Sequence, residues 1–344
     1  MILYEERVGE TLHAEKSESG IRQIAELAGV DVSTVSRALN RRAHVQPATA
    51  ARVFEAARQV GYQQKPLRRV IALILPESRT ILKWYSINVL NALRLEAEQR
   101  NWWLEIISAD QIELLNERAV EGVISFDFNN HLAEKIGSTR NLPMVCINDS
   151  ARHIDRVYSV FSNEFQAVNL AVSHLVGYGH RRIGMIINGD PESYCNRTRH
   201  EAFDRMMRVH NLSAFAECVH GKHSPGDPDS LVRLLHGAVL RMAECGVTAI
   251  INTGESEAAS VLHSLEVCRF RVPEDFSLIT WEMVDVSKFL SPPQTTLCQN
   301  FAELARRAFD TLEKLVAGEP VCRDTLVDYL LCDRSSVAIP PRGR

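Results

Sequence analysis

The sequence lacks any long hydrophobic run, because none of its apolar stretches approaches the roughly 18–20 residues that a membrane-spanning helix requires. The first residues, Met1 to Glu6, turn acidic at once and offer no apolar core for a signal peptide. Both absences argue against a membrane or exported protein. We therefore expect the chain to be cytoplasmic.

Paired cysteines and common catalytic motifs are also missing. None of the eight cysteines forms a CxxC pair, and the closest two, Cys322 and Cys332, are ten residues apart, so we expect reduced thiols with buried packing roles. The chain has no GxSxG, no P-loop and no GxGxxG after a strand. His220 and His223 have no further ligands nearby, so surface histidines are the favoured interpretation. The sequence thus predicts no enzyme, no metal site and no cofactor.

The net charge is small, but the charged residues are unevenly distributed. The net charge is −4, yet residues 21–69 carry nine Lys/Arg against three Asp/Glu, a balance of +6. Residues 1–20 carry −3 and residues 70–344 carry −7, which completes the sum. A short basic module on an acidic body is typical of a nucleic-acid-binding head. A chance cluster of basic residues on a solvated surface is the alternative.

Two helices around a glycine turn are predicted in this basic region. The first covers residues 21–28 and ends at Gly29, which suits the left-handed conformation of a helix C-terminus. The second covers residues 32–40 and follows Asp31, a good N-cap, and a third runs from about Pro47 to Gly61. Apolar spacing predicts that these residues face inward: Ile24, Leu27, Ala28, Val35, Ala38, Leu39, Val53, Phe54, Ala57 and Val60.

The run from Ile24 to Asn40, with Val53 and Gly61-Tyr62 behind it, resembles the head of the lactose-repressor (LacI/GalR) family of transcriptional regulators. A generic three-helix bundle would bury the same apolar residues, but it would not need so polar a face on its middle helix. The resemblance implies a helix-turn-helix that places its second helix in the major groove. It assigns base reading to Val32, Ser33 and Arg37, with Asp31 at the helix start. Phosphate contacts or support are implied for Thr34, Ser36, Asn40 and His44.

The connection behind the head departs from the family pattern. The family has a longer stretch there, with a short hinge helix that wedges a leucine into the minor groove. Here only seven residues, Gln63 to Arg69, separate Tyr62 from the first expected core strand, and Pro66 interrupts them. Leu67 could be a remnant of the wedge, but minor-groove kinking of the usual kind is in doubt.

From Val70 onward, apolar strands alternate with amphipathic helices, which predicts parallel sheets covered on both faces. About 275 residues are too many for one such sheet, so we expect two doubly wound parallel-sheet lobes. Strands are predicted at residues 70–75, 104–107, 122–126, 144–147, 183–187, 249–251 and 278–280, and helices at residues 87–100, 164–178 and 301–317. Trp102 and Trp103 are predicted to end a helix and to serve packing.

The family resemblance extends through this α/β core, in residues 174–184, 271–277 and 292–296, and it implies a periplasmic-binding-protein-like architecture. It also implies an effector site between the lobes. The residues carried over to that site are Trp84, Tyr85, Arg199, Glu255, Glu282, Gln299 and Phe301. Alternatives remain for several of them: Arg199 as a surface salt bridge, Glu282 as a solvated acid and Trp84 as core. Glu255 follows Gly254 where the family has Asn-Asp, so an unusual effector is expected.

The predicted organisation is a tail (1–20), a head (21–62), a short hinge (63–69), an effector-binding and dimerisation core (70–338) and a second tail (339–344). The predicted function is a homodimeric repressor that binds operator DNA under the control of a small molecule. A sugar or sugar phosphate is the family-level expectation for that effector, ahead of a purine. The alternatives are a small-molecule binding module or an enzyme on the same core, with a head not used for specific operator recognition.

Overall fold

The computed structural model describes residues 20–39, 45–60, 62, 69–75, 82, 84–125, 132, 135–136, 139, 141–149, 154, 156–219, 229–254 and 258–341. The chain divides into two compact units, Met1–Arg68 and Arg69–Arg344, which we call the head and the core. The division falls within the predicted hinge. Among the described residues, no helix combines the length and apolar character needed to cross a bilayer.

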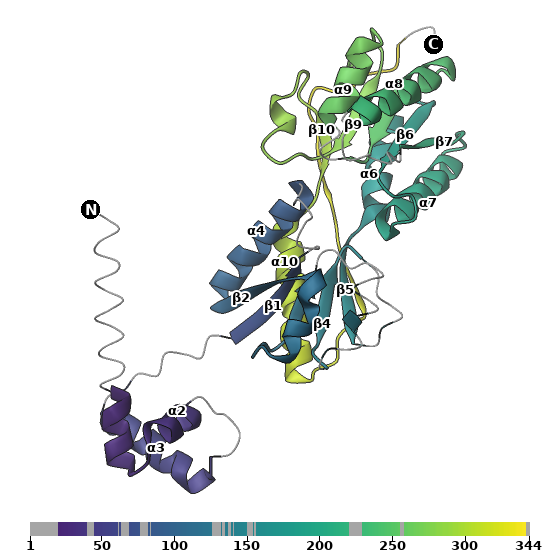
Figure 1. Ribbon diagram of the computed structural model, residues 1–344. Coiled ribbons are helices and arrows are strands. Elements are labelled where there is room, and N and C mark those ends of the chain that lie inside the picture. The colour runs from purple at the N-terminus through teal and green to yellow at the C-terminus, as the bar shows by residue number, and fades with distance from the viewer. Residues whose placement is uncertain are drawn as a thin grey trace, which may run out of the picture. The chain divides into compact units, whose positions relative to one another are not determined.

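The head is a small helical unit (Figure 1). Helical residues 20–28 are followed by Gly29 at φ +61°, then by α2 (Val32–Leu39) and α3 (Pro47–Gln59). As predicted, α2 turns Val35, Ala38 and Leu39 inward, and they pack on Ile24, Ala28, Val53 and Ala57. One prediction was wrong: Leu27 is 58% exposed, because the first helix buries Ala25 beside Ile24 and turns Leu27 to the surface.

The core contains two sheets, as predicted, and in the described residues each has six strands. In lobe 1 the strand order is β11 (Asp324–Val327), β5 (Val157–Ser162), β4 (Met144–Ile147), β3 (Val123–Ser125), β1 (Arg69–Leu75) and β2 (Trp102–Ser108), all parallel. Helices α4 (Trp84–Gln99) and α10 (Phe301–Ala317) pack on one face, and the 3-10 segment η1 (Ala109–Asn116) packs on the other. Trp102 and Trp103 do not end a helix; they open strand β2, where Trp102 is buried and Trp103 is 55% exposed.

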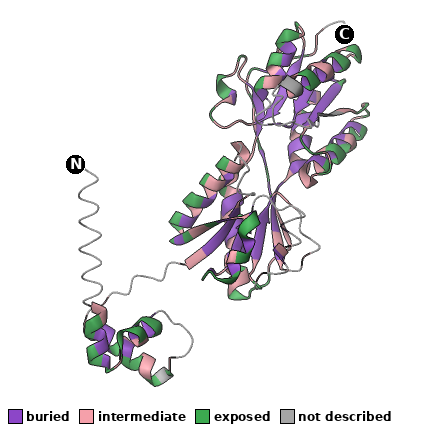
Figure 2. Ribbon diagram, in the orientation of Figure 1, coloured by how far each residue is buried: buried purple, intermediate pink, exposed green. Residues whose placement is uncertain are grey.

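Lobe 2 has the order β12 (Leu330–Cys332), β10 (Thr295–Cys298), β9 (Ser277–Trp281), β8 (Ala249–Asn252), β6 (Ile183–Asn188) and β7 (Phe215–Val219). All neighbours are parallel except β12, which is antiparallel to β10. Helices α6 (Glu164–Gly177) and α7 (Tyr194–Val209) cover one face, and α8 (Asp229–Glu244) and α9 (Ala258–Val267) cover the other. Both sheets form buried layers between more exposed helices (Figure 2).

The chain passes between the lobes three times, and these passages position the site. Crossing 1 leads from β5 through Asn163 into α6. Crossing 2 leads from β10 through Gln299 and Asn300 into α10, and crossing 3 leads from β11 through Asp328 and Tyr329 into β12. The Asn163 side-chain amide donates to Asp328 at 2.7 Å, which ties crossings 1 and 3 together.

Candidate functional site

The start of α2 is a hydrogen-bonded N-cap built on Asp31. One carboxylate oxygen accepts the Thr34 backbone N–H at 3.1 Å, and the other accepts the Thr34 hydroxyl at 2.9 Å. The Ser33 hydroxyl also donates to Asp31. These bonds from Ser33 and Thr34 lower the pKa of Asp31 from 3.8 to about 2, so the carboxylate is charged at neutral pH. A fixed N-cap holds the first turn of α2 in a single geometry.

The outer face of α2 is polar and exposed, as the sequence predicted. Val32, Ser33, Ser36 and Arg37 are exposed, whereas Thr34 is partly buried. The Arg37 Nη2 donates to the Ser33 hydroxyl at 2.9 Å, and its Nε donates to the Ser33 carbonyl at 3.2 Å. These bonds use two of the five N–H groups of Arg37 and hold the side chain along the surface of α2. Three further predicted DNA contacts, Asn40, His44 and Leu67, lie outside the described residues.

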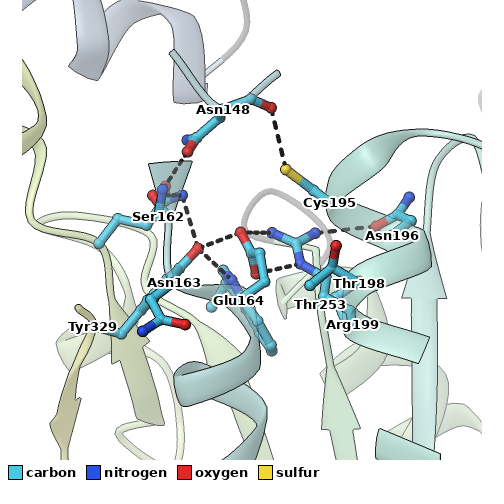
Figure 3. Close-up of polar contacts among 12 residues, drawn as sticks. Asn148, Ser162, Asn163, Glu164, Cys195, Asn196, Thr198, Arg199, Thr253 and Tyr329 are labelled. Atoms are coloured by element: carbon cyan, nitrogen blue, oxygen red, sulfur yellow. Dashed lines mark hydrogen bonds and ion pairs between the residues drawn. The ribbon is translucent and has the colours of Figure 1, made fainter. Parts of the chain in front are cut away.

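A buried ion pair lies where crossing 1 enters lobe 2 (Figure 3). The Glu164 carboxylate accepts Arg199 Nε at 2.7 Å and Arg199 Nη2 at 3.0 Å, while the Arg199 Nη1 donates to Asn196 Oδ1 at 3.1 Å. Glu164 is 1% exposed and Arg199 is 12% exposed. The alternative that Arg199 is a surface salt-bridge residue is therefore wrong. Three of its five N–H groups are used in the described part of the chain, which leaves two for a ligand.

Electrostatics and packing both fix this arginine in place. Burial alone would lower the pKa of Arg199, but the adjacent Glu164 carboxylate outweighs it and the pKa is raised. The guanidinium also lies 4.8 Å from the ring centroid of Trp281, at cation–π distance. Arg199 is thus a permanently charged group whose charge is balanced within the protein.

Tyr329, in crossing 3, connects this ion pair to crossing 2. Its hydroxyl donates to Glu164 at 2.7 Å and accepts the side-chain amide of Gln299 at 2.9 Å and the Trp281 Nε1 at 3.2 Å. Burial, followed by the nearby Glu164 carboxylate, raises the pKa of Tyr329 well above its usual value. Gln299 also donates to the Ser162 hydroxyl at 3.1 Å, next to crossing 1. One buried network therefore joins all three crossings.

Glu282 occupies a second paired position, directly after β9. Its Oε2 accepts Arg334 Nη1 at 2.8 Å and the Thr296 hydroxyl. The Glu282 side chain is 10% exposed, so the alternative of a freely solvated acid is wrong. Glu282 and Arg199 both belong to lobe 2, but no described hydrogen bond or ion pair joins them.

Aromatic side chains gather on the lobe 1 side. Tyr85, in the first turn of α4, packs against Phe301 at the start of α10, with 6.1 Å between ring centroids. The Tyr85 hydroxyl accepts the Asn148 side-chain amide at 2.8 Å. Trp84 is partly buried and its Nε1 has no partner among the described residues. Glu255 lies outside the described residues, whereas its neighbour Gly254 is described.

Two contacts link the lobes directly beside these groups. The Cys195 thiol of α7 donates to the Asn148 carbonyl at 3.4 Å. Phe161 of β5 and Tyr194 of α7 stack with 4.4 Å between centroids. Asn148 has φ +57° and follows β4 immediately, so it stands at the carboxyl end of that strand. The lobes thus meet through small polar and aromatic contacts.

Sequence reasoning missed four members of this site: Asn148, Glu164, Cys195 and Tyr329. Asn148 and Glu164 stand at the carboxyl ends of strands β4 and β5, where open α/β sheets place their binding residues. That position was the available signal for both. No sequence pattern places Tyr329 beside Glu164, since 165 residues separate them.

Comparisons with known proteins support both units. The family described as "Bacterial regulatory proteins, lacI family" matches residues 20–65, and a periplasmic binding protein-like domain matches residues 172–337. The repressor PurR of Mannheimia succiniciproducens is 24% identical over 326 residues, 89% of this chain and 94% of that protein. PurR of Haemophilus influenzae (strain ATCC 51907 / DSM 11121 / KW20 / Rd) is 25% identical over 309 residues, 85% and 89% of the two chains.

Solved structures show the same fold. The Lac repressor dimer bound to operator and an anti-inducer superposes with a TM-score of 0.68 at 21% identity, covering 92% of this chain and 98% of that chain. The transcriptional regulator CelR in complex with cellobiose gives a TM-score of 0.65 at 21% identity, covering 92% and 99%.

Proposed function

We propose that this chain, which belongs to the lacI family of DNA-binding transcriptional regulators with a ligand-binding core, is a repressor. In this proposal an uncharged polyhydroxy effector either releases the repressor from its operator or holds it there. The proposed effector site comprises the following residues: Trp84, Tyr85, Arg199, Glu255, Glu282, Gln299 and Phe301. The single observation that carries the proposal is the Glu164–Arg199 pair beside the three crossings.

The charge balance of this site favours a neutral sugar over a sugar phosphate. Arg199 is neutralised by Glu164, and Glu282 is neutralised by Arg334. A phosphate would need a cation not already paired, and the described site residues do not supply one. Sugar hydroxyls, in contrast, can bond the two remaining Arg199 N–H groups and the Gln299 Oε1, which is buried and has no described partner. CelR, a relative in fold, is seen in complex with cellobiose.

On the DNA side, the proposed contacts keep their predicted roles. Arg37, Ser33 and Val32 read bases, with Asp31 fixing the helix start, and Thr34, Ser36, Asn40 and His44 support phosphate contacts. Leu67 remains the candidate for a minor-groove wedge. Because α2 is only eight residues long, one head contacts few base pairs, and two heads are needed for a specific operator.

We therefore propose a homodimer that acts in the cytoplasm and is not an enzyme. Edge strand β2 and helix α4 of lobe 1 carry exposed apolar residues that suit contact with a second copy. The exposed apolar residues there are Ile87, Leu95, Trp103 and Ile106. The Lac repressor, a relative in fold, is a dimer in its operator complex.

The test is fluorescence anisotropy with the DNA upstream of the chain's own gene, across a salt series and with neutral sugars, sugar phosphates and purine bases. We expect selective binding whose affinity falls steeply with salt and shifts with one neutral sugar. Selective binding that responds only to a sugar phosphate or a purine would contradict the neutral-sugar assignment. Weak binding without salt dependence would contradict the regulator and favour a binding module or an enzyme.

A further inference from the structure

Two cysteines meet on neighbouring strands of lobe 2: Cys298 directly precedes crossing 2, and Cys332 lies three residues beyond Tyr329 of crossing 3. Cys298 is the last residue of β10, and Cys332 is the last residue of β12, the antiparallel neighbour of β10. They are 34 residues apart in the sequence, yet their Sγ atoms are 2.6 Å apart. A disulfide bond is about 2.05 Å long, so a further approach of about half an ångström would join them. Both are free thiols, as the sequence predicted, but they meet in the fold although they are scattered in the sequence.

The pair lies against the proposed effector site. The Cys298 thiol lies 3.8 Å from Glu282 Oε2 and 3.6 Å from the Thr296 hydroxyl. Burial, followed by the hydrogen bond with Cys332, raises the pKa of Cys298 to about 12. Cys298 therefore remains a protonated thiol at neutral pH. Both cysteines are partly exposed, so a small oxidant can reach them.

We propose that Cys298 and Cys332 are a redox modification site: a hydroperoxide converts them to a reversible disulfide that joins β10 to β12 beside crossings 2 and 3 and alters the effector response. The altered effector response rests on the proposed function. Reversible disulfides in reducing compartments are typically redox sensors rather than structural links. Glu282, a residue of the proposed effector site, contacts the Cys298 thiol and so connects this disulfide to effector binding.

The chemistry balances with one hydroperoxide. The Cys332 thiolate attacks a peroxide oxygen of hydrogen peroxide, which breaks the O–O bond, gives a sulfenic acid and releases hydroxide. The Cys298 sulfur then attacks the sulfenic sulfur, so the S–S bond forms, the S–O bond breaks and the oxygen leaves as water with the thiol proton. In total two thiols lose two electrons and two protons, and the peroxide becomes two waters. A dithiol reductant reverses the step.

The expected consequence is mechanical. Crossings 2 and 3 are separate chain segments, and lobe motion requires each to change its backbone angles. A covalent bond between β10 and β12, added to their backbone pairing, restrains the two strands that border these crossings. It also removes the thiol hydrogen that faces Glu282. The oxidised protein should therefore move its lobes less and bind the effector differently.

Peptide mapping of the full chain tests bond formation. The chain is reduced with dithiothreitol, treated with hydrogen peroxide, blocked with N-ethylmaleimide and digested with trypsin. Cleavage after Lys and Arg places Cys298 alone in peptide 289–306 and Cys332 alone in peptide 324–334. We expect these two peptides to be linked and dithiothreitol to separate them. Their absence as a linked pair, with oxidation instead at the exposed Cys245 or Cys322, would overturn the site.

Hydrogen–deuterium exchange tests the mechanical effect without any ligand. Amides of Gln299, Asn300, Asp328 and Tyr329 should exchange more slowly in the oxidised chain. Cys298→Ser and Cys332→Ser should abolish this change, whereas Cys322→Ser, an exposed cysteine, should retain it. The comparison of oxidised and reduced wild-type protein needs no variant to fold. Unchanged exchange in a fully linked sample would refute the switch.

Operator binding with the sugar panel then tests the coupling. Oxidation should shift the concentration of effector that gives half-maximal response by about fivefold or more, and Cys332→Ser should remove the shift. A linked protein with unaltered response would overturn the regulatory half of the proposal. A protein that forms the bond and slows exchange but binds no operator in either state would contradict the proposed function and leave the modification site standing.

Discussion

Glu164 and Arg199 face each other as a two-point ion pair, with Nε–Oε2 at 2.7 Å and Nη2–Oε1 at 3.0 Å. Glu164 is the first residue of α6 after crossing 1, and Arg199 lies midway along α7. The pair therefore joins the two helices of one face of lobe 2 at the point where the chain enters that lobe. It presents Arg199 in one orientation before any ligand binds, which reduces the entropy lost on binding.

Glu164→Gln should destabilise the core by about 3–5 kcal/mol, since it leaves the Arg199 charge buried without its partner. The midpoint of urea unfolding, followed by circular dichroism, measures this. Glu192→Gln is the matched control, because Glu192 is 82% exposed and lies 4.0 Å from Arg197, and it should change stability by less than about 1 kcal/mol. Equal effects of the two substitutions would contradict a buried structural pair.

Tyr329→Phe should keep the ring in its core position but cost about 1–3 kcal/mol, because Gln299 and Trp281 lose a buried acceptor. Effector affinity should fall as well, since Gln299 is then held only by Ser162. Unfolding and sugar titrations on the same sample separate the two effects. A variant with native stability and native affinity would show that the network does not position the site.

Arg37→Ala should weaken operator binding by about 1–3 kcal/mol and relax the preference at one base position. The side chain is exposed on α2 and contacts only Ser33 in the described head, so its loss should leave the fold intact. Anisotropy with operators varied one base pair at a time measures both quantities. Arg208→Ala, in the last turn of α7 in the core, is the control. Uniform weakening without loss of discrimination would reassign Arg37 to phosphate contact.

Stability should decrease as the pH falls below about 6.5, owing to His180. This buried ring bonds the Thr248 hydroxyl at 2.8 Å and the Ala338 carbonyl at 2.9 Å, and burial lowers its pKa below 6.5. Between the lowered pKa of His180 in the folded chain and its value of 6.5 in the unfolded chain, the unfolded chain binds more protons. Acid therefore favours unfolding, and higher pH restores stability. Unfolding midpoints at pH 5 and pH 7 should differ less in His180→Gln than in the wild type. An equal pH effect in both would exclude His180 as the source.

The local elements were predictable because they depend on neighbours in the sequence. The spacing of apolar residues and the glycine turn predicted α2. Strand β4 and helix α10 have the predicted bounds. Strands β10, β11 and β12 were missed: β10 begins with two threonines, β11 begins with Asp-Thr and β12 has only three residues, so none shows the four-residue apolar run by which β4 was predicted. Trp102-Trp103 was assigned to a helix end, although two adjacent aromatic residues suit a strand equally well.

By itself, the sequence determined the two-unit plan, the polar face of α2 and the alternation of strands and helices, because spacing and charge act along the chain. Only the tertiary structure decided that Glu164 pairs with Arg199, that Tyr329 bonds Glu164 and Gln299, and that Cys298 meets Cys332. These contacts join segments separated by 30–165 residues. They arise where three crossings converge between two sheets, and no local pattern specifies which side chains converge there.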